Sequence, residues 1–490
     1  MWCGGRLSAI VESHIAAAGD FTMPVPSPDT VDAVLRHADQ RLDQSREALF
    51  ALLSIPSISA QEAHREDCAR AAAFVRDRLA ALGFRTEIRP TPGHPVVVGH
   101  LDGPADYKGP HVLFYGHYDV QPPDPLELWT SPPFEPQLVD GPRGKRIVAR
   151  GAVDDKGQTT MFLEALRAWH EVGGGIPAKL TVVIEGEEEV GSRNLEPFLI
   201  ANKAELKSDV ALISDTNMWD FATPALTTSL RGLTFVQLTV KAAKRDLHSG
   251  LYGGSALNPI NAITRILGDL QDADGRIQLP GFYDEVKPIS NARRAQWDSL
   301  GFSEAAFLGD VGLSIPVGER GYSALERLWA RPTADINGIW GGYTGQGAKT
   351  VIAAEASAKI TFRLVPGQDP DEVIEQFKHF VMERLPAGAI AEFEGGHGSP
   401  GVDVNADSPW VRAAQAALAE EYGRPAVLMG CGGSIPVVVS LKKVLGIDTL
   451  LMGFGLDDDQ IHSPNEKFEL ECFQHGIRSH VRLLAKFAAG

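Results

Sequence analysis

The chain has few cysteines, and none of them form a CxxC pair. The cysteines are Cys3, Cys68, Cys431 and Cys472. They are too few and too scattered for the disulfide framework of a small secreted protein. The sequence therefore predicts a protein of a reducing compartment.

Signals for export and for membrane insertion are also missing. No apolar run approaches the roughly 18 residues that a membrane-spanning helix needs. The N-terminal stretch contains one early arginine, and Glu12 and His14 interrupt its apolar part, unlike the core of a signal peptide. We expect a cytoplasmic protein without a membrane partner. Met23 is a candidate start residue, which would make residues 1–22 an artefact of the assigned start.

Runs of lysine and arginine are absent as well. The formal net charge is -17 and the sequence pI is near 5.3, so we expect no nucleic-acid partner, because clustered basic side chains bind a phosphate backbone. The acidity serves solubility, although some carboxylates are candidate ligands. With 44% hydrophobic and 22% charged residues, the composition is that of a globular protein. A length of 490 residues predicts two or three domains.

The first half of the chain does contain short apolar runs that alternate with helical patterns. The runs PVVVGHL, HVLFYGHYDV, KLTVVIEGEEE and DVALISD each have the length of a strand. An early helix is predicted from an N-cap at Asp29 or Thr30 to Pro56. A later helix begins near residue 156, and its apolar face consists of Phe162, Ala165, Leu166 and Trp169. This alternation predicts a three-layer α/β/α domain with functional groups at the strand ends.

A different pattern begins near residue 225. Strand-like segments here alternate apolar and polar residues, which is typical of strands with one solvent-facing side. Their apolar positions are Val236, Leu238, Val240, Ala358, Ile360, Phe362 and Leu364. Helix and strand patterns return around residue 400. We therefore predict a discontinuous α/β domain (29–225 and 397–490), an inserted α+β domain (226–396) and an N-terminal extension (1–28).

The strand HVLFYGHYDV ends on an imidazole and a carboxylate, His117 and Asp119. Residues i and i+2 of an extended chain point to the same side, so both can face one cavity. A carboxylate beside a metal-binding imidazole commonly accepts its second N–H and fixes the ring. Taken alone, however, a histidine at a strand end is more often structural or exposed than a metal ligand.

Acidic side chains follow other predicted elements in the same way. Asp154 and Asp155 stand just before the later helix, where one acid suffices as an N-cap. The strand KLTVVIE leads into glutamates that end at Glu189, DVALISD ends on Asp215, and His462 follows TLLMGFG. A charge run is usually a solvated face. Four strands that end in histidine or carboxylate nevertheless predict one shared site.

Imidazoles with several carboxylates suit Zn²⁺, Mn²⁺ or Co²⁺ better than a thiolate site does. Two such metals could share one bridging carboxylate and hold a hydroxide between them. This arrangement lowers the pKa of water and polarises a carbonyl group, so the pattern predicts metal-assisted hydrolysis.

The motifs together resemble the M20 metallopeptidase family, in its cytosolic nonspecific dipeptidase (carnosinase-like) branch. The resemblance runs from LLSIPSIS to the C-terminus, through GHYDVQPP, RGAVDDKG, EGEEEVGS, ISD, DLHSGLYGG, GAKTVI, RLVPGQ, GGSIPV and HSPNEK. It implies a di-metal peptidase domain with an inserted lid and dimerisation domain. The implied reaction is hydrolysis of the amide bond of dipeptides or short peptides with a free C-terminal carboxylate.

The resemblance also implies the metal ligands. It predicts two divalent ions per subunit, Zn²⁺ or Mn²⁺ with Co²⁺ as an alternative. His117 and Asp215 would hold one ion, and Glu189 and His462 would hold the other. Asp154 would bridge the two ions, and the peptide bond after it is expected to be cis, as in the family.

Two catalytic groups are implied next to these ligands. Asp119 would orient His117. Counting back from Gly191 in EGEEEVGS assigns the general base to Glu188, which would take a proton from metal-bound water and return it to the leaving amine. Glu187 is the alternative base, because this chain has a third acid where the family has a neutral residue.

The substrate-binding residues implied by the family lie in the other motifs. His248 would stabilise the oxyanion from the inserted domain of the second subunit, which implies a homodimer. Arg363, opposite its apolar neighbours on a strand, would bind the substrate carboxylate with Ser434, with backbone at Gly433 and with Thr350 of the partner subunit. Without the resemblance, the histidine, the arginine and the glycine would be interpreted as a surface loop, an exposed ion pair and a plain turn.

Two other functions stay open at this point. An N-acyl-amino-acid amidohydrolase or deacylase would use the same di-metal centre, and the pocket for the N-terminal side of the substrate would distinguish it from a dipeptidase. The other alternative is a catalytically inactive member that binds peptide. The intact base, oxyanion and ligand positions argue against it.

Overall fold

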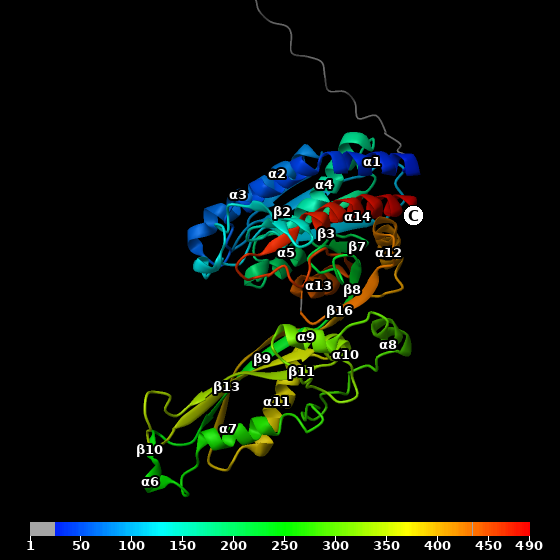
Figure 1. The fold of residues 1–490 in the computed structure, drawn as a ribbon. Coiled ribbons are helices and arrows are strands. Elements are labelled where there is room, and N and C mark those ends of the chain that lie inside the picture. Colours follow the sequence, from blue (N-terminus) through cyan, green and yellow to red (C-terminus); the bar gives the residue numbers. More distant parts are fainter. Residues whose placement is uncertain (1–24, 434) are drawn as a thin grey trace, which may run out of the picture.

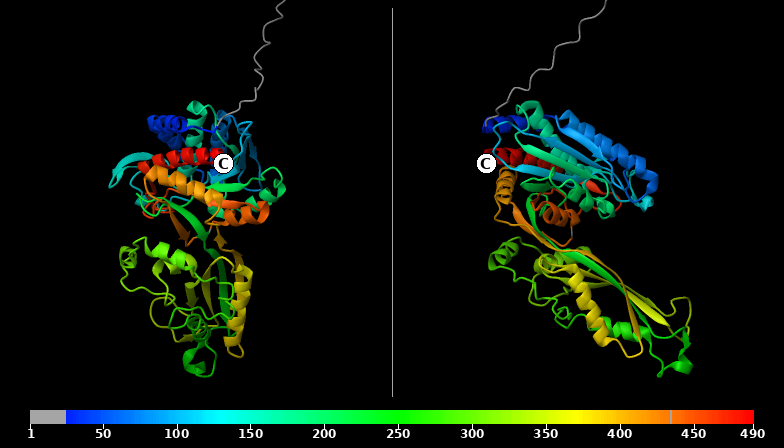
Figure 2. Two further views of the ribbon diagram at one scale, coloured as in Figure 1. Left: turned by 90° about the vertical axis from the view of Figure 1, so that its right-hand side faces the viewer. Right: turned by 180° about the vertical axis from the view of Figure 1, so that it is seen from behind.

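The computed structural model describes residues 25–433 and 435–490, which form two lobes (Figure 1). The upper lobe comprises the chain up to β8 (Ala225–Leu230) and from β15 (Val402–Asp403) onward, and the lower lobe lies between these strands. A mixed sheet with helices on both faces fills the upper lobe, and a separate antiparallel sheet forms the lower lobe (Figure 2). The predicted fold class is thereby confirmed. Most of the predicted extension, residues 1–28, lies outside the described residues.

Among the described residues, the central sheet runs in the order β1-β2-β6-β3-β7-β17-β8-β15, and β16 also pairs with β8. Its other strands are β1 (Arg85–Arg89), β2 (Val96–Leu101), β3 (His111–His117), β6 (Lys179–Glu185), β7 (Val210–Ile213), β16 (Val427–Cys431) and β17 (Asp448–Leu451). β3 lies between β6 and β7 and is parallel to both, and β17 is parallel to β7. The carboxyl ends of these four strands therefore meet at one edge.

Helices cover both faces of the central sheet. One face carries α1 (Pro28–Gln40), α2 (Leu42–Leu53), α3 (Arg65–Ala81), α4 (Lys156–Val172) and α14 (Leu470–Ala489), and the other carries α5 (Leu195–Ala201) and α13 (Pro436–Ser440) (Figures 1 and 2). α12 (Pro409–Tyr422) packs against α14. The core between the layers is continuous, and Phe114 of β3 stacks on Phe162 of α4 with ring centroids 3.8 Å apart. A small sheet of β4 (Gln137–Gly141), β5 (Gly144–Val148) and β18 (Lys467–Glu469) completes the lobe.

The first predicted helix is wrong in two details. The chain forms two helices instead of one, because Arg41 between them leaves the helical region with φ −105° and ψ 12°. The break lets both helices direct an apolar face to the core. The N-cap is Ser27 rather than Asp29 or Thr30, since the Ser27 hydroxyl accepts the backbone N–H of Thr30. Pro28 suits the first helical position, where its missing N–H costs nothing.

α4 is buried on nearly all sides, not only on the predicted face. Lys156 and Glu164 are buried along with the predicted apolar face of Phe162, Ala165, Leu166 and Trp169. Their charges have internal partners: the Lys156 ammonium donates to the carbonyls of Leu52 and Ile55, and Glu164 accepts from the Ser45 hydroxyl. The neighbouring helices enclose α4, which the pattern within one helix cannot reveal.

The lower lobe is built on an antiparallel sheet in the order β11-β13-β9-β14. Its strands are β9 (Gly232–Lys241), β11 (Thr333–Gly341), β13 (Glu355–Leu364) and β14 (Ile390–Ser399), and α7 (Pro259–Gly268) and α11 (Pro370–Arg384) pack on one face. The predicted alternation is confirmed, because the core holds Val236, Leu238, Val240, Ala358, Ile360, Phe362 and Leu364. Arg363 points to the opposite face and is only half-buried.

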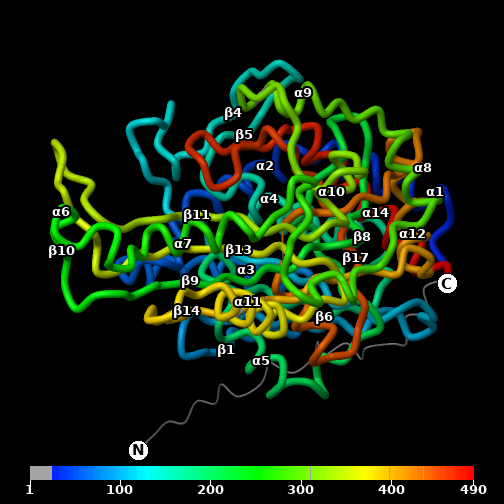
Figure 3. The backbone as a smooth tube through the Cα atoms, turned by 90° about the horizontal axis from the view of Figure 1, so that it is seen from below, coloured from blue at the N-terminus to red at the C-terminus, as the bar shows by residue number. Residues whose placement is uncertain are grey.

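A small ladder forms the tip of the lower lobe, at the end remote from the central sheet (Figures 1 and 3). It pairs β10 (Leu247–His248) with β12 (Val351–Ile352), and α6 (Ser249–Tyr252) follows directly. Leu251 and Tyr252 are exposed there. The tip therefore presents polar and apolar side chains to the surroundings rather than to its own upper lobe.

The junction segment, residues 287–330, connects the two lobes with α8 (Asn291–Asp298), α9 (Glu304–Asp310) and α10 (Ala324–Ala330). The rings of Trp297 and Trp329 meet edge to face at 5.2 Å, and the Trp297 indole N–H donates to the carbonyl of Leu428 in β16 at 3.3 Å. The segment thus packs against the upper lobe, although it falls inside the predicted inserted domain. The domain limits at residues 225 and 397 stay a prediction.

No described helix combines the length and the apolar composition needed to cross a bilayer.

A buried histidine in α14 carries a measurable consequence for stability. The His480 Nδ1–H donates to the carbonyl of Gly476 at 2.7 Å, and Nε2 accepts from the Ser214 hydroxyl at 3.0 Å. Burial lowers the pKa of His480 to about 4, from an ordinary value of 6.5. Between these two values the unfolded chain binds a proton that the folded protein excludes, so stability must fall as the pH falls.

We therefore expect the free energy of unfolding of the wild-type protein to decrease more steeply than that of His480→Gln as the pH falls from 6.5 to 4. The difference in the free energy of unfolding should approach a value on the order of 3 kcal/mol at the acid end. Urea unfolding midpoints measured for both proteins across this range provide the test. Parallel pH profiles for the two proteins would show that His480 does not exclude a proton.

Candidate metal centre

The loops that carry the predicted ligands meet at the carboxyl edge of the central sheet. His117 is the last residue of β3, and Asp215 follows β7 by two residues. Glu189 lies in the helical turn after β6, His462 lies in the loop after β17, and Asp154 stands just before α4. Because β6, β3, β7 and β17 are consecutive in the sheet, their ends place these side chains side by side.

Asp154 lies between the two imidazoles. Its Oδ1 is 3.1 Å from His117 Nε2, and its Oδ2 is 3.0 Å from His462 Nε2. Asp215 Oδ2 lies 3.7 Å from His117 Nε2, and Glu189 Oε2 lies 3.1 Å from His462 Nε2. The side chains thus form two groups of three that share Asp154, and within each group the ligand atoms lie within 4.8 Å of one another.

This donor set fits two divalent cations. Each group offers one imidazole nitrogen and two carboxylate oxygens, a combination that suits Zn²⁺, Mn²⁺ or Co²⁺. The shared Asp154 directs one oxygen to each group, as a bridging ligand does. His117 is fully buried, whereas the His462 side chain is 52% exposed. The centre is therefore open to a substrate from the His462 side.

The charges of the cluster raise the pKa of both imidazoles. Burial lowers the pKa of His117, but hydrogen bonds with neighbouring carboxylates, Asp119 foremost, hold it well above its ordinary value. Hydrogen bonds with Asp154 and Glu189 raise the pKa of His462 to about 10. A metal-binding imidazole must be neutral, so cations have to displace these protons, and metal affinity must increase with pH.

Asp119 contacts more of the site than the sequence indicated. The His117 Nδ1 atom lies 3.1 Å from the backbone carbonyl of Asp119 and 3.3 Å from its Oδ1. The same carboxylate also accepts the backbone N–H groups of Glu188 and Glu189, at 3.3 and 3.1 Å. Asp119 therefore positions the glutamate turn as well as the imidazole. Sequence reasoning missed this contact, which joins two loops about 70 residues apart in the chain.

Of the three consecutive glutamates, Glu187 differs in its contacts from the other two. Glu187 turns away from the cluster, because its carboxylate accepts from the Asn194 side chain at 2.8 Å and packs against Gly93. Glu188 is close enough to feel the charges of the cluster: burial, together with nearby carboxylates such as Asp215, raises the pKa of Glu188 to about 9. The turn Glu188–Val190 ends at Gly191, whose φ of 88° favours glycine.

The peptide bond between Asp154 and Asp155 is cis, as expected. The interpretation of one of these two acids as an N-cap is wrong, because Asp155 occupies the cap position but its side chain makes no cap hydrogen bond to α4. Its carboxylate instead accepts the backbone N–H of His117 at 3.1 Å and the hydroxyl of Thr159 at 2.8 Å. Asp155 thus ties the end of β3 to the start of α4, and Asp154 alone faces the two imidazoles.

The structure places Arg363 in a cavity of about 440 Å³ between the lower sheet and the junction segment. Arg231, at the end of β8, lines the same cavity and donates to the carbonyl of Gly432 at 3.2 Å. Burial and the charge of Arg363 lower the pKa of Arg231 to about 10. Gly433 follows in the same loop, and Ser434 lies outside the described residues. The sequence analysis missed Arg231. A charged residue at the end of a strand, the signal that identified the candidate metal ligands, could have found it.

His248 and Thr350 are not near the metal ligands of their own chain. Both lie at the tip of the lower lobe, where the backbone N–H of Ser249 donates to the carbonyl of Thr350 at 3.0 Å (Figure 1). His248 is exposed, and its Nδ1 accepts the backbone N–H of Gly250 at 3.0 Å. Within one chain the structure therefore brings these two residues to each other and not to the cluster.

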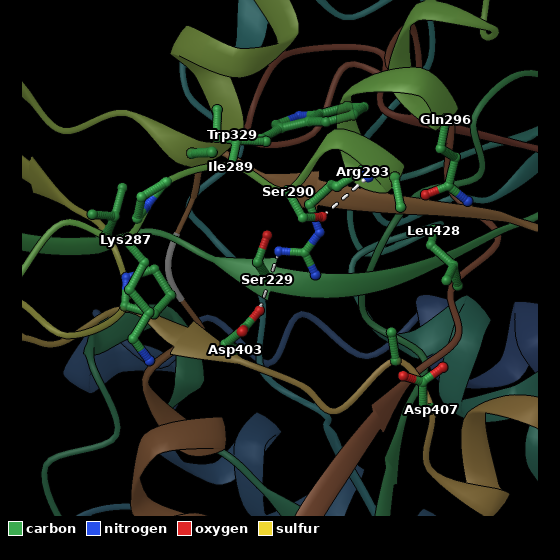
Figure 4. Close-up of a pocket in the computed structure, with 16 residues that line it drawn as sticks. Ser229, Lys287, Ile289, Ser290, Arg293, Gln296, Trp329, Asp403, Asp407 and Leu428 are labelled. Carbon is green, nitrogen blue, oxygen red and sulfur yellow. Dashed lines mark hydrogen bonds and ion pairs between the residues drawn. The ribbon is translucent and has the colours of Figure 1, made fainter.

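A larger cavity, of about 650 Å³, lies at the junction of the lobes and not at the metal ligands (Figure 4). Its walls come from the junction segment, from β8 and β16, and from the chain near β15. Arg293 of α8 crosses it toward Asp403 of β15 with a nitrogen to oxygen distance of 3.5 Å. The convergence of titratable ligands, rather than cavity size, identifies the candidate site.

Comparisons with known proteins all indicate the same family of peptidases. Residues 113–486 match the profile of Peptidase family M20/M25/M40. The chain is 31% identical to the Cys-Gly metallodipeptidase dug1 of Schizosaccharomyces pombe, over 92% of this chain and 96% of that protein. It is 29% identical to the human Beta-Ala-His dipeptidase, over 96% of this chain and 95% of that protein.

A solved structure is similar to this chain over nearly its whole length. The dipeptidase Dug1p from Saccharomyces cerevisiae superimposes with a TM-score of 0.77 at 27% sequence identity, covering 94% of this chain and 99% of that chain. The similarity therefore extends over the central sheet and the inserted antiparallel sheet together.

Proposed function

The chain belongs to peptidase family M20/M25/M40, in the branch of the Cys-Gly and Beta-Ala-His dipeptidases, and on that premise we propose that it hydrolyses dipeptides or short peptides with a free C-terminal carboxylate. The observation that carries the proposal is the position of Asp154, with one oxygen toward each of the two imidazoles.

The proposed cofactor is a pair of divalent metal ions, Zn²⁺ or Mn²⁺. His117 and Asp215 would hold one ion, Glu189 and His462 the other, and Asp154 would bridge them. When bound, such a pair lowers the pKa of water and polarises the scissile carbonyl. Asp119 keeps His117 oriented through Nδ1, which leaves Nε2 free for the metal.

Glu188 is the proposed general base. Its pKa of about 9 belongs to a cluster of carboxylates, and positive charge in the two ligand groups would lower it. The ionised Glu188 carboxylate then takes a proton from the attacking water and returns it to the amine of the leaving residue. Glu187 serves a structural role instead, because its carboxylate is held by Asn194.

Arg363 is proposed to bind the C-terminal carboxylate of the substrate. A guanidinium matches a carboxylate with two parallel hydrogen bonds. Arg231 adds a second positive charge to the same cavity, and its contact with Gly432 links that charge to the loop of Gly433. This pair of cations supports a requirement for a free carboxylate, and hence exopeptidase activity. The Ser434 hydroxyl is a further proposed contact.

We also propose that two copies of the chain form the active enzyme. His248 and Thr350 lie at the exposed tip of the lower lobe, remote from the metal ligands of their own chain. A second subunit docked through the inserted lobe would bring its tip to the first subunit's metal centre. His248 would then donate to the developing oxyanion, opposite the metals.

The substrate class is tested with a paired panel of free dipeptides and the matching N-acetyl amino acids, using metal-reconstituted protein of known metal content. We expect faster cleavage of the dipeptides by protein that holds about two metals per subunit. Preference for the acylated compounds would reassign the enzyme to the N-acyl-amino-acid amidohydrolases. No turnover by fully loaded protein would favour a peptide-binding role.

The base assignment is tested with two neighbouring variants. Glu188→Gln should lower turnover by about 10²- to 10⁴-fold, the usual contribution of a positioned base, while metal content stays near wild type. The matched control Glu187→Gln makes the same chemical change one residue earlier and should retain activity. Loss of turnover in Glu187→Gln alone would move the base to Glu187.

The shared site is tested by mixing two inactive variants. Glu188→Gln and His248→Ala subunits, unfolded and refolded together, should recover about a quarter of wild-type activity, because half of the dimers contain one intact site. Neither variant refolded alone should recover it. If the mixture stays inactive while size measurements show dimers, His248 does not act across the subunit boundary.

A further inference from the structure

A buried carboxylate outside the ligand set connects the loops that carry the ligands. Glu466 is 0% exposed and lies four residues after His462. Its Oε2 accepts from Arg150 Nη1 at 2.7 Å and from the backbone N–H of Gly151 at 2.9 Å. Its Oε1 accepts the backbone N–H groups of Val153 and Asp154, at 3.0 and 3.2 Å. One carboxylate thus satisfies four donors of the loop that ends in the bridging residue.

Arg150 extends this connection to a third loop. Its side chain is 1% exposed, and its Nη2 donates to the carbonyl of Pro122 at 3.3 Å, five residues after His117. Its guanidinium also lies over the ring of Trp129, 5.6 Å from the centroid. The Arg150–Glu466 pair therefore joins the loops of His117, Asp154 and His462.

The backbone holds Glu466 itself in place. The backbone N–H of Ala149 donates to the Glu466 carbonyl at 3.1 Å. The next residues form β18, which pairs with β5. The ladder thus holds the backbone of Glu466, so losing the hydrogen bonds of its carboxylate releases the loop of Asp154 while Glu466 stays in place.

We propose that Glu466, with Arg150, is a positioning residue that sets the separation of Asp154 and His462. It thereby sets the affinity of the metal site formed by Asp154, Glu189 and His462, which we call the second metal site. The inference rests on the proposed metal-dependent function. Asp154 belongs to both groups of ligands, but only the group with Glu189 and His462 draws on both loops that Glu466 joins. That group therefore depends more strongly on the carboxylate.

An amide cannot replace this carboxylate. Each carboxylate oxygen accepts two N–H groups, and glutamine offers one oxygen and one NH₂ that only donates. Whichever way the amide turns, its NH₂ group replaces one carboxylate oxygen. The two buried N–H groups that this oxygen accepted then lose their acceptor and face another donor. The Glu466→Gln side chain keeps its size, so the change acts on the hydrogen bonds and not on packing.

The test is a Co²⁺ titration of the metal-free protein, followed by visible absorption and by metal content per subunit. For Glu466→Gln we expect the second equivalent to bind about 10- to 100-fold more weakly, the usual effect of removing a partner behind a metal ligand, with an altered absorption spectrum. The first equivalent should change less. Arg150→Lys should also weaken binding of the second Co²⁺ equivalent, by a smaller factor. This variant provides the test if Glu466→Gln does not fold.

The matched control is Glu421→Gln, in the same lobe and away from the ligands. The Glu421 side chain is 1% exposed and accepts from His475, Arg478 and Arg482. Wild-type affinity for both Co²⁺ ions in Glu466→Gln would overturn the proposal, and so would an equal weakening in Glu421→Gln. A wild-type protein that binds no Co²⁺ would instead contradict the proposed function.

Discussion

Repulsion between like charges at the carboxyl edge of the central sheet is the constraint that organises the upper lobe. Asp154, Asp215, Glu188 and Glu189 gather there around two imidazoles, largely out of water. Charges in such a place persist only when they are paired or hydrogen-bonded. The imidazoles of His117 and His462 pair with these acids. Behind the candidate ligands, three further carboxylates, those of Asp119, Asp155 and Glu466, accept backbone N–H groups of Glu189, His117 and Asp154 respectively. These bonds hold the backbone of the candidate ligands, so the like charges stay in fixed positions.

The sequence was most informative about features that depend on the pattern within a single strand, such as which residues stand at its end and which face each side chain occupies. The apolar runs that end at His117 and Glu185 became adjacent parallel strands, so their ends had to meet. The alternation around Arg363 predicted which face it occupies, because a strand has a period of two. Both the fold class and the convergence of the ligands could therefore be read from local patterns, although the bridging assignment of Asp154 needed the family resemblance.

Other features depend on packing between distant segments, which no local pattern encodes. The burial of Lys156 and Glu164 arises from helices that enclose α4, and a single helix does not reveal its neighbours. The bend at Arg41 reflects the shape of the core that two helices cover. Arg231 and the donors around Glu466 are joined to partners hundreds of residues away. Turn and capping rules could not predict these contacts.

The junction segment has a mechanical consequence for any swing of the lower lobe. Trp297 and Trp329 fasten it to β16, while the chain on either side continues into the lower sheet. The lower sheet can then rotate only by shearing past α8 and α10, or by dragging them off β16. The space between Arg293 and Asp403 lies on the surface that the second motion would open, between α8 and the upper-lobe strand β15 (Figure 4). Because of this gap, less close-packed surface has to separate when α8 leaves the upper lobe than a fully packed contact would require.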